Sequence, residues 1–136
     1  MQNKKPNKGF YLAVLLAALL PTAAACEAAP ENNLGYEQIS GAEAKALMDT
    51  EAGYVIIDAR TEEEFAEGHI PGAVLIPEYK ISEKAEDMLP DKDTLILVYC
   101  RSGRRSKLAA EELVKLGYTS VKEFGGIIYW EYETEK

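Results

Sequence analysis

The 136-residue sequence predicts an α/β domain in which helices cover both faces of a parallel sheet. Short apolar runs rich in β-branched residues are typical of buried strands, and they recur along the chain. They alternate with helix signals, namely Ser or Thr followed three residues later by Glu, or an apolar stripe that ends at Gly or Pro. Strands that alternate with helices form parallel sheets, and such sheets bind ligands at the carboxyl ends of their strands.

The first elements of the predicted domain are a short strand and a capped helix. The strand is expected at Gly35–Ile39. Ser40 follows with Glu43 three residues on, a capping box that predicts a helix start. The apolar stripe of this helix is expected to contain Ala42, Ala46, Leu47 and Met48. The next run, Tyr54–Ile57, is short, apolar and β-branched, which indicates a buried strand.

The middle of the domain repeats this pattern. Thr61 and Glu64 form a second capping box, which opens a short helix that ends near Gly68. Ala73–Ile76 is predicted to be another short strand, and Pro77 closes it.

The strongest strand prediction comes next along the chain. Ser82–Leu89 is expected to be a helix that Pro90 stops. Thr94–Tyr99 then reads Thr-Leu-Ile-Leu-Val-Tyr, a nearly continuous apolar run, and it ends directly before Cys100. Such a run predicts a fully buried strand.

The last elements are a helix, a strand and an aromatic-rich end. Ser106–Leu116 is predicted to be a helix with Gly117 as its stop. Its apolar face is expected to contain Leu108, Ala109, Leu113 and Leu116. Val121 lies in a last short strand, after which Gly125-Gly126 is expected to turn into a final helix.

Residues 1–25 are predicted to be a secretory signal peptide. They hold three lysines and no acid, and an apolar run follows the lysines over Phe10–Leu20 before Pro21 breaks it. The run is about half of the ~20 apolar residues that a membrane-spanning helix needs. A basic start, a short apolar core and the small residues that follow it are the pattern of a cleaved leader.

The end of this leader, Ala23-Ala24-Ala25-Cys26, resembles a bacterial lipobox, in which the cysteine is lipidated and becomes the new N-terminus. The resemblance implies a protein of the bacterial cell envelope that is anchored to the membrane through acyl chains on Cys26. Two alternatives stay open. Cleavage after Ala25 or Ala29 gives a free periplasmic or secreted protein, and an uncleaved leader gives a membrane anchor. Equal labelling of wild type and Cys26→Ala by palmitate would reject Cys26 as the lipid site.

Charge and composition limit the function of the mature chain. Residues 26–35 are predicted to be a tether and residues 36–136 a single domain, whose small size favours a monomer. The formal net charge of the whole chain is −8, and it becomes −11 once the three leader lysines are removed. This acidity argues against nucleic-acid binding, which needs a basic face. Two cysteines and one histidine cannot build a disulfide framework or a Cys/His zinc site, so no metal is expected.

The chemistry is predicted to lie at Cys100, where the strongest strand meets a helix. The joining segment over 98–106 reads Val-Tyr-Cys-Arg-Ser-Gly-Arg-Arg-Ser. A cysteine at such a junction faces backbone amides and the positive end of the helix dipole, which stabilise an anion and so favour the thiolate. Gly103 permits a tight loop and a close approach of the backbone to a ligand.

The distribution of arginines also points to the segment after Cys100. The chain has four, at Arg60, Arg101, Arg104 and Arg105, and three of them follow Cys100 closely. Arginine binds oxyanions in a fork, whereas lysine acts as a point charge. Their clustering in an acidic chain indicates an anion site, and the two arginine-bearing stretches are expected to form one pocket. The alternative is a solvated basic helix start beside a buried, inert cysteine.

Several motifs together resemble single-domain rhodaneses over about residues 36–132. The motifs are Asp58-Ala-Arg60, Glu64-Phe65, Gly68-His-Ile-Pro-Gly-Ala73, Cys100-Arg-Ser-Gly-Arg-Arg-Ser106, and Gly125-Gly126 with Trp130. The resemblance implies a rhodanese fold with a parallel sheet of about five strands between helices. It also implies a sulfurtransferase. Cys100 would attack the outer sulfur of a small anionic donor such as thiosulfate, become a persulfide, and pass that sulfur to a thiol or to cyanide.

The resemblance also assigns roles to the residues around Cys100. The predicted substrate-binding residues are Arg101, Ser102, Gly103, Arg104, Arg105 and Ser106. Arg101 and Arg104 are expected to contact the substrate anion, whereas Arg105 and Ser106 are expected to brace the loop and cap the helix. The predicted partners are the donor and the acceptor thiol, and no cofactor is implied.

Residues outside the loop are expected to have supporting roles. Asp58 and Arg60 lie at the end of a neighbouring strand, where Asp58 either orients the loop or pairs with an arginine. His69 invites a Cys–His interpretation, but it lies in a turn that is structural in the resembled family. Tyr129 and Trp130 are expected to pack the final helix on the sheet, with the rim of the pocket as the alternative.

Three other functions stay open at this point. Phosphatases and arsenate reductases also use a Cys–loop–Arg cradle, but their terminal arginine lies one position further from the cysteine than Arg105 does from Cys100. A binding module that has lost catalysis would usually have lost the nucleophile. A persulfide carrier or redox sensor would use the same residues as the enzyme.

Overall fold

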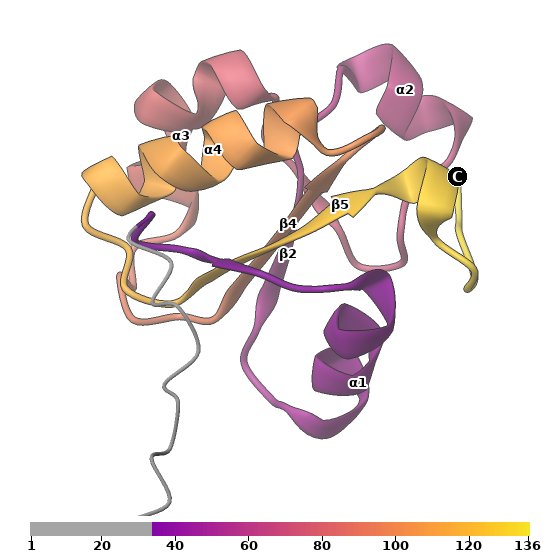
Figure 1. Cartoon of the computed structure of the whole chain (residues 1–136). Coiled ribbons are helices and arrows are strands. Elements are labelled where there is room, and N and C mark those ends of the chain that lie inside the picture. Colours follow the sequence, from indigo (N-terminus) through magenta and orange to yellow (C-terminus); the bar gives the residue numbers. More distant parts are fainter. Residues whose placement is uncertain (1–33) are drawn as a thin grey trace, which may run out of the picture.

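The computed structural model describes residues 34–136, which form an α/β domain around one five-stranded sheet (Figure 1). Every strand pair is parallel, and the strand order is β1-β5-β4-β2-β3. The predicted fold class is confirmed. The predicted leader, Cys26 and nearly all of the predicted tether lie outside the described residues. Within residues 34–136, no helix is long and apolar enough to cross a membrane.

The central strand is β4, Ile96–Cys100, and all of its residues are buried. It lies between β5 (Val121–Gly126) and β2 (Val55–Asp58). The outer strands are shorter, with β1 at Glu37–Gln38 and β3 at Val74–Leu75. Because all the strands run the same way, the last residue of β4 lies in the middle of the carboxyl edge, where parallel sheets bind ligands.

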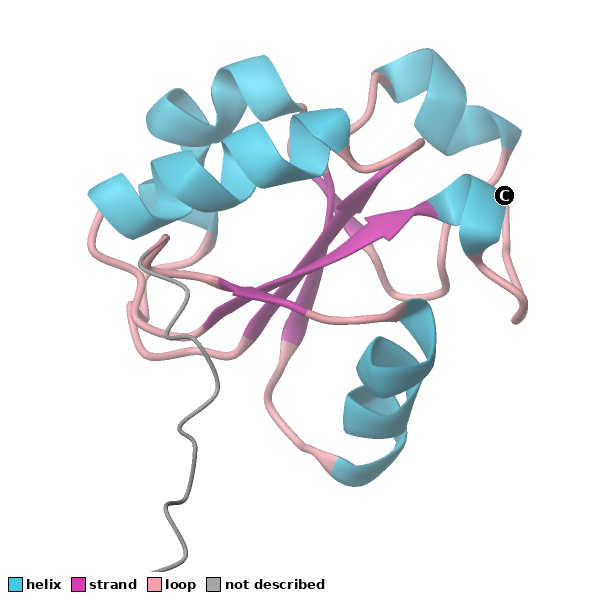
Figure 2. Ribbon diagram, in the orientation of Figure 1, coloured by secondary structure: helices cyan, strands magenta, loops and turns pink. Residues whose placement is uncertain are grey.

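Helices cover both faces of this sheet (Figure 2). α3 (Ile81–Met88) and α4 (Arg104–Lys115) pack on one face, and α1 (Gly41–Thr50) packs on the other. The remaining helical elements are α2 (Glu62–Glu67) and the two 3₁₀ turns η1 (Glu78–Lys80) and η2 (Ile127–Tyr129).

Both predicted capping boxes are present. Ser40 Oγ accepts the N–H of Glu43 at 3.1 Å, and the Glu43 carboxylate accepts the N–H of Ser40 at 2.7 Å. Thr61 and Glu64 form the same reciprocal pair at the start of α2. Two otherwise unpaired N–H groups are satisfied at each helix start, which fixes where the helix begins.

The side chains of β4 alternate between two apolar cores. Ile96 and Val98 point into the core beneath α3 and α4, and Cys100 belongs to the same cluster. Leu97 and Tyr99 point into the core on the α1 side. The two-residue period of a strand therefore directs the Cys100 side chain towards the face that α4 covers.

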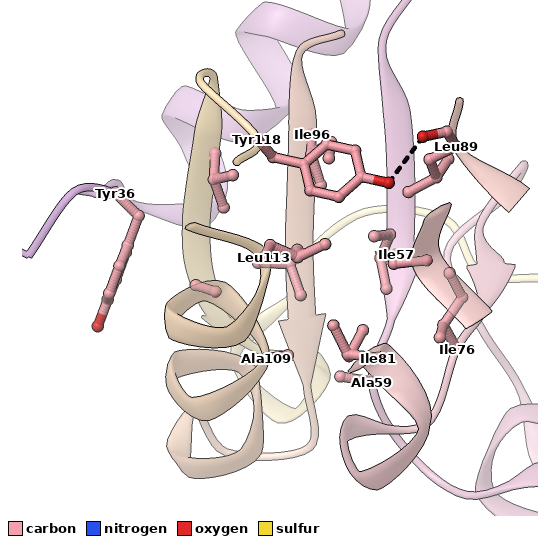
Figure 3. Close-up of a cluster of buried hydrophobic side chains, with 14 of the residues drawn as sticks. Tyr36, Ile57, Ala59, Ile76, Ile81, Leu89, Ile96, Ala109, Leu113 and Tyr118 are labelled. Atoms are coloured by element: carbon pink, nitrogen blue, oxygen red, sulfur yellow. Dashed lines mark hydrogen bonds between the residues drawn. The ribbon is translucent and has the colours of Figure 1, made fainter. Parts of the chain in front are cut away.

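Figure 3 shows the core on the α3 and α4 face. Leu113 of α4 lies there with Ile57 of β2 and Ile96 of β4. The Tyr118 hydroxyl donates to the Leu89 carbonyl at 2.7 Å, so the polar end of this buried ring is satisfied. This packing fixes α4, and with it the helix start that follows Cys100.

The predicted apolar stripes of two helices need correction. In α1, Ala42 and Ala46 are exposed, whereas Ala44 is fully buried with Leu47 and Met48 partly buried beside it. Residues three and four positions apart share one helix face, so a stripe through Ala44, Leu47 and Met48 leaves the other two alanines outside.

The stripe predicted for α4 is wrong at one position. Leu108 is 42% exposed, and Ala110 is buried instead, together with Ala109 and Leu113. Two small alanines at the contact allow α4 to approach the sheet closely, which the larger Leu108 would prevent.

The predicted final helix is also wrong. β5 continues through Gly125 and Gly126, and only the three-residue turn η2 follows it. Trp130 packs on Phe124, with ring centroids 5.7 Å apart, whereas Tyr129 is 72% exposed and does not pack on the sheet. The chain then extends so that Glu135 pairs with His69 through two backbone hydrogen bonds of 2.8 Å, which leaves no length for a further helical turn.

Candidate active site

Cys100 lies at the turn between β4 and α4. α4 begins at Arg104, and Gly103 is its N-terminal cap with a φ of +107°, a conformation that residues with a Cβ rarely adopt. This turn brings the Gly103 N–H back onto Cys100 Sγ at 3.0 Å. The cysteine is 1% exposed, so its sulfur lies at the bottom of the loop rather than on the surface.

The surroundings of Cys100 favour its thiolate. Burial alone raises the pKa of a thiol. Hydrogen bonds from the Ser106 hydroxyl and from the N–H groups of Ser106, Gly103 and Ser102 outweigh that effect and hold the pKa of Cys100 below its ordinary value. The sulfur is therefore a stronger nucleophile near neutral pH than a buried cysteine without these donors.

Gly126 supports the loop from the neighbouring strand. It pairs with Cys100 across β4 and β5, and its Cα faces the loop backbone. A Cβ at this position would overlap the Arg101 carbonyl and lie 2.5 Å from Ser102 Cα. The same Arg101 carbonyl accepts the N–H of Ile128 at 3.2 Å, so β5 and η2 together fix the path of the loop.

The four arginines fall into two groups, two that are exposed and two that are bound by carboxylates. Arg101 and Arg104 are exposed, and neither side chain forms a hydrogen bond or ion pair among residues 34–136. Arg105 is bound by Glu64 through two hydrogen bonds of 2.7 and 2.8 Å. Arg60 is buried and bound by Asp58. Of the arginines, Arg101 and Arg104 are thus the two that remain available for an external anion.

The Asp58–Arg60 pair belongs to a buried cluster on β2. Arg60 donates to Asp58 at 2.7 Å and to the Gly68 carbonyl at 2.7 Å. The Tyr99 hydroxyl donates to the same carboxylate at 2.6 Å and accepts the Ile70 N–H at 3.1 Å. Burial and the neighbouring Asp58 raise the pKa of Tyr99, which keeps its proton on the hydroxyl. The cluster ties the segment after α2 to β4, so it supports the site without contacting the sulfur.

The Glu64–Arg105 pair makes stability depend on pH. The hydrogen bond from Arg105, with help from the Thr61 cap, lowers the pKa of Glu64 from 4.5 to about 2. A lowered folded-state pKa contributes stability that is present above pH 4.5 and is lost as the pH falls through about 2. Arg105→Gln is expected to lower the free energy of unfolding by about 1 kcal/mol near neutral pH.

Urea unfolding across this pH range measures the difference in the free energy of unfolding between wild type and Arg105→Gln. The gap between wild type and Arg105→Gln is expected to close as the pH falls from 4.5 to about 2. Lys107→Gln removes an exposed cation from the same helix and serves as the control. A gap that stays constant down to the lowest pH would contradict the assignment of the ion pair.

His69 is placed away from the cysteine. Its ring stacks on Phe65 with centroids 3.7 Å apart, and Nδ1 lies 2.9 Å from the Phe65 carbonyl. Nε2 lies 3.4 Å from the Glu135 carboxylate. Both ring nitrogens are thus occupied between α2 and the C-terminal segment, which supports a structural role. Within residues 34–136, no group of three or more metal-ligating side chains gathers.

Two residues at the site were not predicted from the sequence, Glu123 and Tyr99. Glu123 is a buried acid on β5, and its carboxylate accepts the Ser106 hydroxyl at 2.6 Å and the Gly125 N–H at 2.8 Å. A charged residue inside a buried strand is unusual, and that was the available signal. Tyr99 gave no signal, since an aromatic residue in a buried strand is ordinary.

The chain is similar to known rhodanese domains and sulfurtransferases. A family model described as "Rhodanese-like domain" matches residues 40–133. The thiosulfate sulfurtransferase PspE of Escherichia coli (strain K12) is 39% identical over 71 residues, which cover 52% of this chain and 68% of the relative. The putative sulfurtransferase YtwF of Bacillus subtilis (strain 168) is 39% identical over 99 residues, which cover 73% and 94%. A solved structure, "rhodanese with anions from E. coli", matches with a TM-score of 0.58 and 35% identity over 61% of this chain and 98% of its own.

Proposed function

The chain belongs to the rhodanese-like domain family, and on that premise we propose that it is a sulfurtransferase whose Cys100 carries sulfur as a persulfide. One observation carries the proposal. Cys100 Sγ lies at the carboxyl end of the central strand, accepts the Gly103 N–H at 3.0 Å, and is followed by two arginines without carboxylate partners in the described chain. This arrangement suits an anionic donor and a sulfur nucleophile.

The first half of the reaction loads the cysteine. The Cys100 thiolate attacks the outer sulfur of a donor such as thiosulfate, a sulfur–sulfur bond forms, and the bond to the sulfonate sulfur breaks. Sulfite leaves with the electron pair of that bond. The terminal sulfur of the persulfide keeps one negative charge, which the N–H groups of the loop stabilise.

The second half returns the cysteine to its starting state. An acceptor thiolate, or cyanide, attacks the terminal sulfur of the persulfide, and Cys100 leaves as a thiolate. No second cysteine is needed, which agrees with Cys100 being the one cysteine of residues 34–136. Thiosulfate and the departing sulfite are both doubly charged oxyanions. Arg101 and Arg104 therefore bind the donor and stabilise the leaving group.

The loop gives less support to phosphate chemistry. Arg105 lies five positions after Cys100, one fewer than the cradle of phosphatases uses. Its guanidinium is also held by Glu64 at 2.7 and 2.8 Å and does not complete a ring around an anion at the sulfur. A small loop with two outward arginines fits a sulfur donor better than a tetrahedral phosphate ester.

Turnover of thiosulfate with cyanide tests the function and the role of Arg104 together. The full chain is expected to form thiocyanate, and Arg104→Ala is expected to lower kcat/KM for thiosulfate on the order of 100-fold. Its thermal midpoint is expected to stay that of wild type, because the Arg104 side chain is exposed and has no partner within residues 34–136.

Lys107→Ala is the matched control, since Lys107 is also exposed and cationic and lies one turn further along α4. It is expected to keep the activity of wild type. Wild-type protein that forms no thiocyanate, or an equal loss in both variants, would argue against the proposed site. Equal loss would mean that overall charge and not Arg104 attracts the donor.

A further inference from the structure

Two large apolar side chains are exposed beside the nucleophile loop, and the mechanism above does not use them. Ile128 is 55% exposed and Tyr129 is 72% exposed. Both belong to η2, which follows β5 and lies beside the turn from β4 to α4 (Figure 1). The Ile128 N–H donates to the Arg101 carbonyl at 3.2 Å, so this apolar pair begins next to the loop that holds Cys100. A single exposed apolar side chain is ordinary, but adjacent ones at a reactive group indicate a binding surface.

The fold holds this apolar pair outward. Ile127 and Trp130, on either side of the pair, pack against the core on the α1 face. The Trp130 ring centroid lies 5.7 Å from that of Phe124, and the Trp130 backbone N–H donates to the Ile127 carbonyl at 3.1 Å, which closes the turn. Ile128 and Tyr129 are thereby fixed in place before anything binds. A preorganised surface of this kind loses less conformational entropy when a partner docks on it.

Two exposed arginines complete the surface around the cysteine. Arg101 lies in the loop and Arg104 at the start of α4, and neither side chain has a partner within residues 34–136. We call these two arginines, together with Ile128 and Tyr129, the acceptor rim. Tyrosine and arginine are among the residues enriched at protein interfaces. Because Cys100 is 1% exposed at the bottom of the loop, a bulky acceptor that reaches its sulfur meets the surface around the loop.

The two arginines lose their ligand halfway through the reaction. They hold the donor dianion during loading, and they are left without that anion once sulfite departs. The terminal sulfur of the loaded cysteine then carries one negative charge against two guanidinium groups. An acceptor can supply a further negative charge as a carboxylate beside its thiol. The chain as a whole is acidic, but charges more than about 8 Å apart are largely screened at physiological salt, so this carboxylate has to lie close to the thiol.

We infer that the sulfur acceptor is a protein segment whose reacting cysteine has an apolar residue on one side and a carboxylate on the other. This inference rests on the proposed function. The apolar residue packs on Ile128 and Tyr129, and the carboxylate binds the two arginines of the acceptor rim. The acceptor thiolate attacks the terminal sulfur of the persulfide, a new sulfur–sulfur bond forms, and the bond to Cys100 Sγ breaks. The acceptor leaves as a persulfide anion and Cys100 remains as a thiolate, so atoms and charge are conserved.

Two other occupants fit the acceptor rim less well. A small acidic thiol would bind the arginines but leave Ile128 and Tyr129 uncovered. An anionic membrane surface would repel a chain whose formal net charge is −8. A protein segment with both an apolar and an acidic side chain uses the whole rim.

Transfer from the loaded protein to synthetic peptides tests the inference. The full chain carrying Cys26→Ser is loaded with thiosulfate, freed of excess donor and mixed with a peptide that holds one cysteine, and intact mass follows the loss of sulfur. The first peptide has leucine before the cysteine and aspartate after it. The second replaces the leucine by serine, and the third replaces the aspartate by asparagine. Each rate is divided by that of the same peptide with a small disulfide, which corrects for thiolate content. The first peptide is expected to react about tenfold faster than either of the others.

Variants of the exposed residues assign these preferences to the acceptor rim. Ile128→Ser combined with Tyr129→Ser is expected to remove the preference for leucine and to keep the preference for aspartate. Tyr79→Ser is the matched control, because Tyr79 is also an exposed tyrosine in a 3₁₀ turn but lies beside Leu108 and Glu111 of α4. It is expected to keep both preferences. Cyanide is too small to use the apolar pair, so it is expected to unload every variant at the wild-type rate.

Several outcomes overturn the inference. Equal corrected rates for the three peptides would mean that the surface around the loop does not select the acceptor. Glutathione that reacts as fast as the first peptide would mean that a small acidic thiol suffices. Phosphatidylglycerol vesicles that bind the wild type but not the double variant would assign the apolar pair to a membrane. A chain that gains no sulfur from thiosulfate fails the proposed function itself, whereas a chain that loads and unloads with cyanide but treats all peptides alike fails only this inference.

Discussion

Gly126→Ala is expected to lower the rate of sulfur transfer by at least about 100-fold, since displacing a reactive loop by an ångström has effects of that size. The added Cβ overlaps the Arg101 carbonyl and lies 2.5 Å from Ser102 Cα, both of which are backbone atoms that cannot rotate away. The loop must move, and the Gly103 N–H must leave Cys100 Sγ. We also expect a loss of about 3 kcal/mol in the free energy of unfolding, because overpacking strains a buried contact. Thiocyanate formation and urea unfolding measure the two effects.

Gly53→Ala is the matched control for this variant. Gly53 has a φ of +76°, but no heavy atom lies within 4 Å of a Cβ built there. Gly53→Ala therefore introduces backbone strain without a steric clash. It is expected to lower the free energy of unfolding by about 1 kcal/mol and to keep wild-type sulfur-transfer activity. Gly126→Ala with wild-type turnover would contradict the view that this close approach shapes the loop.

Asp58→Asn is expected to be the most destabilising of the conservative substitutions around the site. It leaves the buried Arg60 guanidinium without a counter-charge, and removing one partner of a buried ion pair costs about 3–5 kcal/mol. It also replaces one of the two carboxylate oxygens with an NH₂ group, so the remaining oxygen cannot accept all the hydrogen bonds that Arg60 and the Tyr99 hydroxyl donate to Asp58. Urea unfolding near neutral pH gives the magnitude.

A second substitution separates the ion pair from other effects of the change. When Arg60→Leu is added to Asp58→Asn, part of the lost stability should return, because the uncompensated charge is gone. If the double variant is as unstable as the sum of the two single ones, the pair is not coupled as the structure indicates.

The fold could be predicted because its local signals agree with one another. The capping boxes at Ser40 and Thr61 placed two helix starts correctly, and the apolar run before Cys100 identified the central strand. The incorrect predictions concerned which helix residues pack against other elements. Ala42 and Ala44 both fit an apolar pattern, so the sequence alone does not show which of them packs on the sheet. The shape of the neighbouring core determines that Ala44 is the buried one.

The candidate site was predicted where one short segment supplies it. The strand–loop–helix pattern at Cys100 was enough to expect amides around the sulfur, and the Gly103 N–H lies there. Pairing of Asp58 with an arginine was one of the two roles expected for that residue, and Arg60 is its partner. The partner of Arg105, Glu64, could not be predicted because it lies 41 residues away in the sequence. Glu123 was missed for the same reason, since its partner Ser106 is 17 residues away and only the sheet brings the two together.

The most direct test of the central claim is the intact mass of the protein after incubation with thiosulfate. The full chain carrying Cys26→Ser should gain the mass of one sulfur atom, lose it on addition of cyanide, and gain nothing when Cys100→Ser is also present. The hydroxyl of Cys100→Ser occupies the same place but cannot form a persulfide. No adduct on the single-thiol protein, or an adduct that persists in Cys100→Ser, would contradict a persulfide on Cys100.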